Sequence, residues 1–177
     1  TLHGLWPQPR DKEYCDVYNR NLWASRDGRW LDLPPLDLTI AQRRDLDLVM
    51  PGSRSGLDRH EWTKHGTCYG SGQRDYFADS LDLMLALNAS PVVDLFAGNI
   101  GKRITLNQLR NAFDTAFGAG AGDRVAMICA DDGNRTIITE IRINLTGDIS
   151  GPDNFGDLIR AADPAAIGCR SGQVDAV

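Results

Sequence analysis

The spacing of hydrophobic residues predicts helices over most of the first two thirds of the chain. Apolar side chains recur every three or four positions from about Asp37 to Met50, from Gln73 to about Asn88 and from Leu106 to Phe117. That period matches one face of an α-helix. A shorter helix is expected from Pro91 to Phe96, because proline is favoured in the first turn of a helix.

Polar residues that can cap helices support these boundaries. Asp37 or Thr39 precedes the first helix, and Thr105 precedes the helix that begins at Leu106. Short oxygen-bearing side chains at such positions accept hydrogen bonds from the unpaired N–H groups of the first turn. Asp58, with Glu61 three residues later, has the spacing of a capping box and predicts the start of a further helix.

Two segments near the end of the chain have the composition of β-strands. Val125–Cys129 is continuously apolar. Thr136–Leu145 alternates between polar and apolar residues from Glu140 onward, so one of its faces is expected to be exposed to solvent. Asp131–Asn134 supplies turn residues between them. Helices early and an antiparallel pair late predict an α+β domain, in which several helices pack on an antiparallel sheet.

Two stretches are expected to lack regular structure. Residues 1–35 hold four prolines and an Asp-Gly pair, which break helices and strands. Leu2 is expected to close a short strand that delivers His3. The tail from Gly151 is also predicted to be mostly loop.

Composition limits the classes of function. The chain has 177 residues, an ordinary hydrophobic fraction of 42% and a net charge of −5, which fits a single domain over residues 1–177. It has no apolar run of the roughly 20 residues that a membrane span needs. Proteins that hold RNA mainly through its phosphates are basic, so any contact with RNA is expected at a small cationic site.

The segment His60–Cys68, which reads His-Glu-Trp-Thr-Lys-His-Gly-Thr-Cys, concentrates the candidate chemistry. A helix turns about 100° per residue, which brings four protonatable side chains to one side: His60, Glu61, Lys64 and His65. Burying four such groups costs free energy, so this side of the helix is expected to face water or a substrate. The His-Glu-x-x-His zinc motif needs its second histidine one residue earlier, so no metal is predicted; a polar surface helix is the alternative.

The start of the chain contains the remaining histidine, in the segment His3–Pro7, which reads His-Gly-Leu-Trp-Pro. His3 and His60 stand about 57 residues apart. Together, the two segments resemble the active-site segments of the ribonuclease T2 family. Met50-Pro51-Gly52, Tyr69-Gly70 and Thr139-Glu140-Ile141 are similar to the bacterial, ribonuclease I-like branch. The resemblance covers most of the chain.

This resemblance implies a ribonuclease T2-like α+β fold and an endoribonuclease that cleaves single-stranded RNA. Family members carry a strand ahead of the first segment, and we expect that N-terminal strand to be missing, since the sequence opens two residues before His3. We expect a periplasmic or secreted monomer, with no cofactor, no membrane association and no obligatory protein partner.

The resemblance also implies catalytic roles. His65 is the general base on the 2′-hydroxyl, and His3 is the general acid for the leaving 5′-oxygen; imidazole suits both tasks because it titrates near neutral pH. Lys64, His60 and Glu61 are expected to hold the phosphate. The product is a 2′,3′-cyclic phosphate that water can open, and no metal takes part.

Residues that bind the bases are a separate prediction. Trp6 and Tyr14 are candidates to stack on the base 5′ to the cut. Ser53 and Arg54 are candidates to meet the 3′ nucleotide. Gln8 stands where fungal relatives often have an acidic residue, so their base preference does not carry over.

The four cysteines allow three pairings, and no C-x-x-C spacing occurs. The resemblance implies the bonds Cys15–Cys68 and Cys129–Cys169. The first bond would tie the segment after His3 to the end of the predicted catalytic helix. Such bonds persist outside the cytosol; four reduced thiols are the alternative.

Two other classes of function remain open. One is a metal-dependent hydrolase, which a chelator would inactivate. The other is a catalytically idle RNA-binding protein on the same fold. The presence of His3, Lys64 and His65 favours the enzyme.

Overall fold

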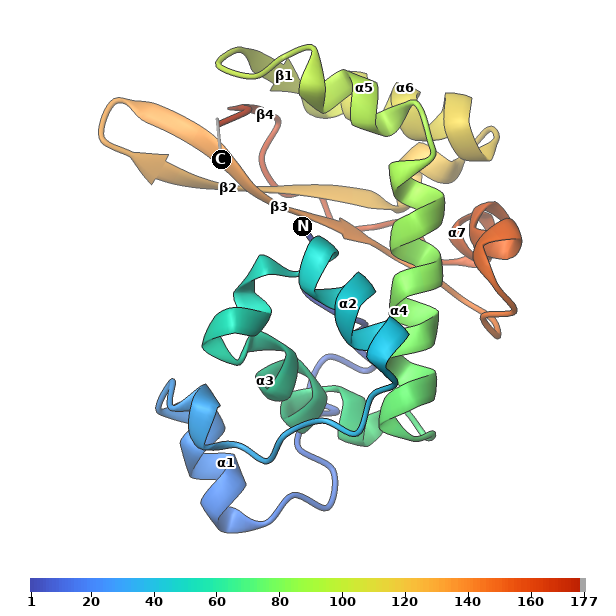
Figure 1. The fold of residues 1–177 in the computed structure, drawn as a ribbon. Helices are drawn as coiled ribbons and strands as arrows, with labels where there is room; N and C mark the ends of the chain where they lie inside the picture. The colour runs from blue at the N-terminus through green and yellow to red at the C-terminus, as the bar shows by residue number, and fades with distance from the viewer. Residues whose placement is uncertain (176–177) are drawn as a thin grey trace. The chain divides into compact units, whose positions relative to one another are not determined.

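A computed structural model describes residues 1–175 (Figure 1). These residues form seven α-helices and a four-stranded sheet, which confirms the predicted α+β class. The chain divides into two compact units, Thr1–Met84 and the part from Leu85 onward. Each unit is described by itself.

The first unit is helical. Its elements are α1 (Asn19–Arg26), α2 (Ile40–Val49), α3 (Leu57–Lys64) and the greater part of α4 (Gln73–Asn88). At the start of α2, the Thr39 hydroxyl accepts from the backbone N–H of Gln42 at 3.1 Å, and the Gln42 side chain accepts from the backbone N–H of Thr39. Of the two predicted caps, Thr39 is therefore the one used.

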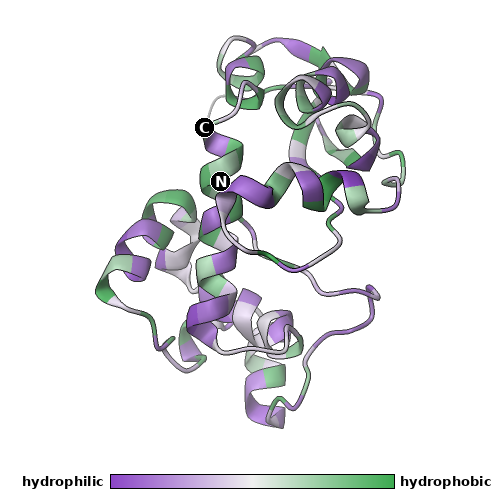
Figure 2. Ribbon diagram, turned by 90° about the vertical axis from the view of Figure 1, so that its right-hand side faces the viewer, coloured by the Kyte–Doolittle hydropathy of each residue, from purple (hydrophilic) through white to green (hydrophobic). Residues whose placement is uncertain are grey.

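The core of this unit lies among α2, α3 and α4. Four residues are fully buried there: Leu46, Met50, Tyr76 and Phe77. Partly buried apolar side chains surround them, among them Leu2, Leu5, Leu57 and Trp62. Figure 2 shows hydrophobic and hydrophilic residues alternating along the helices, as expected of helices with one apolar side.

Two predictions for residues 1–35 were wrong. Asn19–Arg26 is the helix α1. Its sequence is polar and it buries only Ala24 and Ser25, so it has no apolar stripe from which a helix could be predicted. Leu2 closes no strand, because residues 1–7 have no regular structure. Instead, its backbone N–H donates to the carbonyl of Val49 at 2.8 Å, which fixes the start of the chain to the end of α2.

The predicted capping box at α3 was also wrong. Gly56, with a φ of 85°, precedes the helix as its N-cap, and Asp58 lies inside the first turn. Asp58 is 1% exposed and pairs with Arg43 at 2.7 Å. A buried carboxylate without a cationic partner is strongly destabilising, so Asp58 pairs with Arg43 instead of capping the helix. Glu61 is thereby left for a different contact, described below.

The second unit contains the sheet and three further helices. In chain order its elements are α5 (Val92–Ala97), β1 (Arg103–Thr105), α6 (Leu106–Phe117), β2 (Val125–Asp132), β3 (Arg135–Ile143), α7 (Phe155–Ala161) and β4 (Ser171–Gln173). The strand order is β1-β4-β3-β2. The predicted hairpin β2–β3 is antiparallel, as is β1–β4, whereas β3 and β4 meet in parallel at Ile137 and Gln173. Thr105 caps α6 as predicted.

The tail from Gly151 lies mostly outside α-helix and β-strand, as predicted, but it also contains α7 and β4, which the sequence did not predict. Helix α7 buries Phe155, Leu158 and Ile159, whose spacing of three and four is helical. The strand β4 reads Ser-Gly-Gln and has no apolar pattern. It is defined only by pairing with its neighbours in the sheet.

Both disulfides that the resemblance implies are formed. Cys15–Cys68 lies in the first unit, and Cys129–Cys169 joins β2 to the segment ahead of β4 in the second. Among residues 1–175, no helix is both long and apolar enough to cross a bilayer.

Candidate active site

Helix α3 carries most of the predicted catalytic residues. His60, Glu61 and Lys64 lie on it, and the helix ends at Lys64, so that His65 is its C-cap. The backbone N–H of His65 still donates to the carbonyl of Glu61 at 2.9 Å. His65 is therefore held at the end of the last turn rather than on the continuous helical face that the sequence suggested. Gly66 then lets the chain turn against Trp62, because a Cβ there would overlap the indole.

The segment of His3 reaches α3 through two close contacts. The buried hydroxyl of Tyr76 donates to the carbonyl of Leu5 at 3.0 Å and accepts from its N–H at 3.2 Å. At Gly4, a Cβ would lie 2.8 Å from Oε2 of Glu61 and 2.8 Å from the Tyr76 hydroxyl. Only glycine allows the backbone next to His3 to come this close to Glu61.

Trp6 connects the two segments directly. Its indole N–H donates to Oε2 of Glu61 at 2.8 Å. Its ring stacks on His65, with centroids 5.2 Å apart and an interplanar angle of 28°. The ring of His3 lies 6.2 Å from the same indole. Both predicted acid–base histidines and the predicted carboxylate thus gather around one tryptophan.

His60 has a separate support. Its Nδ1 lies 2.7 Å from the hydroxyl of Ser25 in α1. Trp30 stacks on the imidazole at a centroid distance of 4.6 Å, and the Trp30 indole N–H donates to the carbonyl of Ser25 at 3.0 Å. Sequence reasoning missed Ser25, because nothing local marks a serine whose partner stands 35 positions away.

The imidazoles of His60 and His65 are both held neutral at ordinary pH. Burial, reinforced by the positive charge of Lys64, lowers the pKa of His60 to about 4. The same two causes, in the same order, lower the pKa of His65 to about 4. The Lys64 ammonium itself lies 3.4 Å from a carboxylate oxygen of Glu13. An unprotonated imidazole beside a lysine is suited to accept a proton while the lysine stabilises an anion.

A family model described as Ribonuclease T2 family matches residues 1–154. The chain belongs to the ribonuclease T2 family. Ribonuclease I of Escherichia coli is 29% identical over 185 residues, which cover 95% of this chain and 68% of that protein. Ribonuclease 1 of Arabidopsis thaliana is 31% identical over 66% of this chain and 50% of its own length.

Solved structures agree at the level of the fold. The self-incompatibility associated SF11-RNase of Nicotiana alata superposes with a TM-score of 0.59 at 18% identity, covering 96% of this chain and 80% of that one. Membership of the family confirms the prediction of a T2-type, RNA-cleaving endoribonuclease.

Tyr14, a predicted base-stacking residue, lies close to the end of α3. Its backbone N–H donates to the carbonyl of Lys64 at 2.8 Å, and the neighbouring Cys15 bonds to Cys68 just beyond α3. The guanidinium of Arg26 lies 5.2 Å from the centre of the Tyr14 ring. One face of this ring is therefore already covered, and a role for Tyr14 in stacking on a base stays a prediction.

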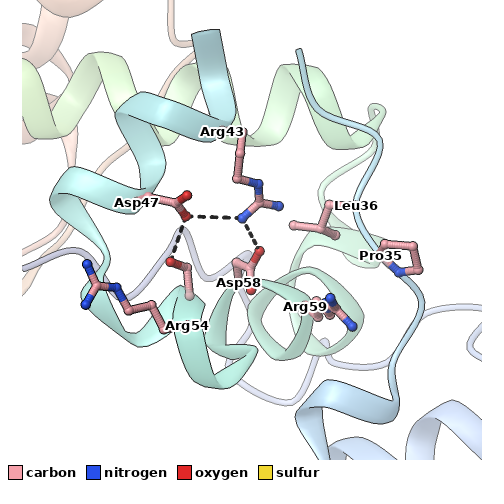
Figure 3. A pocket seen from close by; sticks show the side chains of 8 residues that line it. Pro35, Leu36, Arg43, Asp47, Arg54, Asp58 and Arg59 are labelled. Carbon is pink, nitrogen blue, oxygen red and sulfur yellow. Dashed lines mark hydrogen bonds and ion pairs between the residues drawn. The ribbon is translucent and has the colours of Figure 1, made fainter. Parts of the chain in front are cut away.

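The remaining predicted base-binding residues are Gln8, Ser53 and Arg54. The exposed Gln8 side chain donates to the carbonyl of Trp6 at 3.2 Å. Ser53 and Arg54 belong to the 3₁₀ turn Pro51–Ser55 and line a pocket of about 370 Å³ (Figure 3). Its eight lining residues include none of the predicted catalytic ones. A role for these three residues in binding nucleotides stays a prediction.

The pocket in Figure 3 is instead organised by ion pairs. Arg43 contacts the carboxylates of Asp47 and Asp58, and the Ser53 hydroxyl donates to Asp47 at 2.8 Å. These bonds tie α2 to α3 and to the turn between them. Within residues 1–175, no cluster of three His, Cys, Asp or Glu side chains could hold a metal ion.

Proposed function

We propose that this T2-family chain is a monomeric, periplasmic or secreted enzyme that cleaves single-stranded RNA without a metal ion, through a 2′,3′-cyclic phosphate. One observation carries the proposal. Trp6 contacts His65, lies near His3 and is hydrogen-bonded to Glu61, so one indole gathers residues from both segments. The two disulfides and the extracellular relative from tomato support the location.

In the first step, His65 takes the proton of the 2′-hydroxyl, and the 2′-oxygen attacks phosphorus. The lowered pKa of about 4 leaves His65 unprotonated and able to act as a base in mildly acidic and neutral solution. His65 is also 5% exposed, so bulk water competes little for its ring nitrogens. These properties support the base role over the acid role.

The bond from phosphorus to the 5′-oxygen then breaks, and protonated His3 gives its proton to that oxygen. The side chain of His3 is exposed, unlike that of His65, which suits a group that must follow a leaving strand. The cyclic phosphate is opened by water with the two roles exchanged, so that the enzyme ends with its original protons.

Charge on the phosphorane is stabilised by Lys64, with His60 and Glu61 completing the site. Lys64 carries a positive charge in the last turn of α3, and Glu13 holds its ammonium at 3.4 Å. Preorganised donors and charges aimed at a developing anion are typically the largest contribution to such catalysis. No protein residue forms a covalent bond to phosphorus in this scheme.

The proposal is tested by incubating the purified chain with single-stranded homopolymeric RNAs in excess chelator and analysing the product ends. We expect cleavage to continue and to yield 2′,3′-cyclic phosphates and free 5′-hydroxyls. Activity that returns only when zinc or magnesium is added would contradict the metal-independent mechanism. The variant Lys64→Met, which removes the charge but keeps most of the apolar stem, serves as the inactive control.

A further inference from the structure

Ser25 is a buried polar residue that belongs to neither active-site segment. It is 2% exposed, and its hydroxyl lies 2.7 Å from Nδ1 of His60. Buried hydroxyls are costly without partners, so the Ser25 proton and lone pairs must be used inside the protein. The second partner within reach is the phenol of Tyr14, whose oxygen lies 3.4 Å from that of Ser25.

The imidazole of His60 is restrained on one face and at one nitrogen. Trp30 covers the ring at a centroid distance of 4.6 Å, and its own N–H is fixed on the carbonyl of Ser25. Because Ser25 occupies Nδ1, the nitrogen left for a ligand is Nε2. Among residues 1–175, the side-chain hydrogen bond of His60 is the one that Nδ1 makes with Ser25.

The direction of the hydrogen bonds determines whether Nε2 of His60 is a hydrogen-bond donor or an acceptor. A neutral imidazole carries one N–H. If Tyr14 donates to Ser25 and Ser25 donates to Nδ1, the proton of His60 resides on Nε2. In the opposite order Nε2 presents a lone pair, which repels the oxygens of a phosphate. The carbonyl of Ser25 receives the Trp30 N–H, and its own contact with the imidazole opposes the lowering of the pKa of His60.

We propose that Ser25 is a positioning residue that holds His60 in the tautomer with its proton on Nε2, so that this N–H is presented to a phosphate oxygen of the RNA. The inference rests on the proposed function for its substrate. It adds that His60 acts as a neutral hydrogen-bond donor, and that α1, which contains none of the predicted catalytic residues, takes part in building the active site.

The kinetic test uses Ser25→Ala with a dinucleotide substrate. Loss of one hydrogen bond that orients a donor should lower kcat about five- to tenfold and change KM little. Ser25→Thr keeps the hydroxyl and should restore most of the rate. The matched control is Ser80→Ala, since Ser80 is 1% exposed and its hydroxyl donates within α4 to the carbonyl of Tyr76 at 2.7 Å; it should leave both constants unchanged.

A double-mutant cycle separates positioning from general damage. If Ser25 acts through His60, Ser25→Ala should cause no further loss in a His60→Ala background, because coupled residues are not additive. An equal loss in both backgrounds would overturn the inference. Thermal unfolding of each variant verifies that all of them are folded.

Nitrogen-15 spectra of His60 in the unmutated chain test the tautomer without using activity. We expect Nδ1 to be unprotonated and Nε2 protonated at neutral pH, and we expect Ser25→Ala to mix the two forms. A protonated Nδ1 in the unmutated chain would overturn the assignment. A chain that shows the expected spectrum but cleaves no RNA would instead refute the proposed function.

Discussion

The indole N–H of Trp6 donates a 2.8 Å hydrogen bond to Oε2 of Glu61, across 55 positions of sequence. The same indole stacks on His65. The sequence suggested that Trp6 stacks on a base of the RNA, but its N–H and its contact with His65 are already used inside the site. Within the protein this side chain holds the carboxylate of Glu61 and the imidazole of His65 in place, and its stacking on a base stays a prediction.

The first prediction separates these two roles of Trp6. Trp6→Phe keeps an aromatic ring against His65 but removes the N–H that Glu61 accepts. We expect kcat to fall about fivefold or more, the equivalent of one hydrogen bond, with KM nearly unchanged. If Trp6 serves mainly to stack a base, KM should instead rise while kcat is kept. Steady-state kinetics on a dinucleotide distinguishes these results.

Some elements of the fold could be predicted from the sequence, and others could not. Helices α2, α4 and α6 and the hairpin β2–β3 were predicted because each is long enough to repeat its apolar pattern, and Thr39 and Thr105 mark two starts locally. The strands β1 and β4 have three residues each and no pattern. They form because neighbouring segments supply their hydrogen bonds, and the local sequence gives no indication of that pairing.

The same division applies to the site. His3, His60, Glu61, Lys64 and His65 were predicted from two short segments, and the structure places the side chains of His3, Glu61 and His65 around Trp6. The support of His60 by Ser25 was not predicted, since it depends on a polar helix packing against α3. Residue identity carries the chemistry of such a site, whereas tertiary packing decides how each group is oriented.

A second prediction concerns Gly4. In Gly4→Ala, the new Cβ would lie 2.8 Å from Glu61 and from the Tyr76 hydroxyl, so the first segment must move away from α3. Such overpacking typically costs about 1–3 kcal/mol of stability, and displacement of His3 should lower kcat as well. Gly72→Ala is the control, because a Cβ there meets nothing within 4 Å. Equal unfolding midpoints in urea for the two variants would contradict this close approach.

A third prediction links the buried histidines to stability. Burial and Lys64 lower the pKa of both His60 and His65 from 6.5 to about 4. Between these values the unfolded chain binds more protons than the folded one, so the free energy of unfolding should be highest above pH 6.5 and decrease as the pH falls toward 4. Urea denaturation at several pH values measures this dependence.

The matched variant for the pH dependence replaces both residues by asparagine, which is polar but does not titrate. It should be less stable at neutral pH but should lose less stability between pH 6.5 and pH 4 than the unmutated chain. An identical dependence in both proteins would show that other groups cause it. The acidic groups are the same in both proteins, so they do not affect the comparison.

The last prediction assigns the acid and the base. General acid–base catalysis is typically worth about 10²–10⁴-fold per group, so His65→Ala and His3→Ala should each lose about two decades or more on ordinary RNA. On a substrate whose leaving group is a nitrophenolate, the departing oxygen needs no proton. His3→Ala should therefore recover most of its rate on that substrate, whereas His65→Ala should not. Recovery in His65→Ala alone would reverse the two roles, and a loss below tenfold in both would refute catalysis by these histidines.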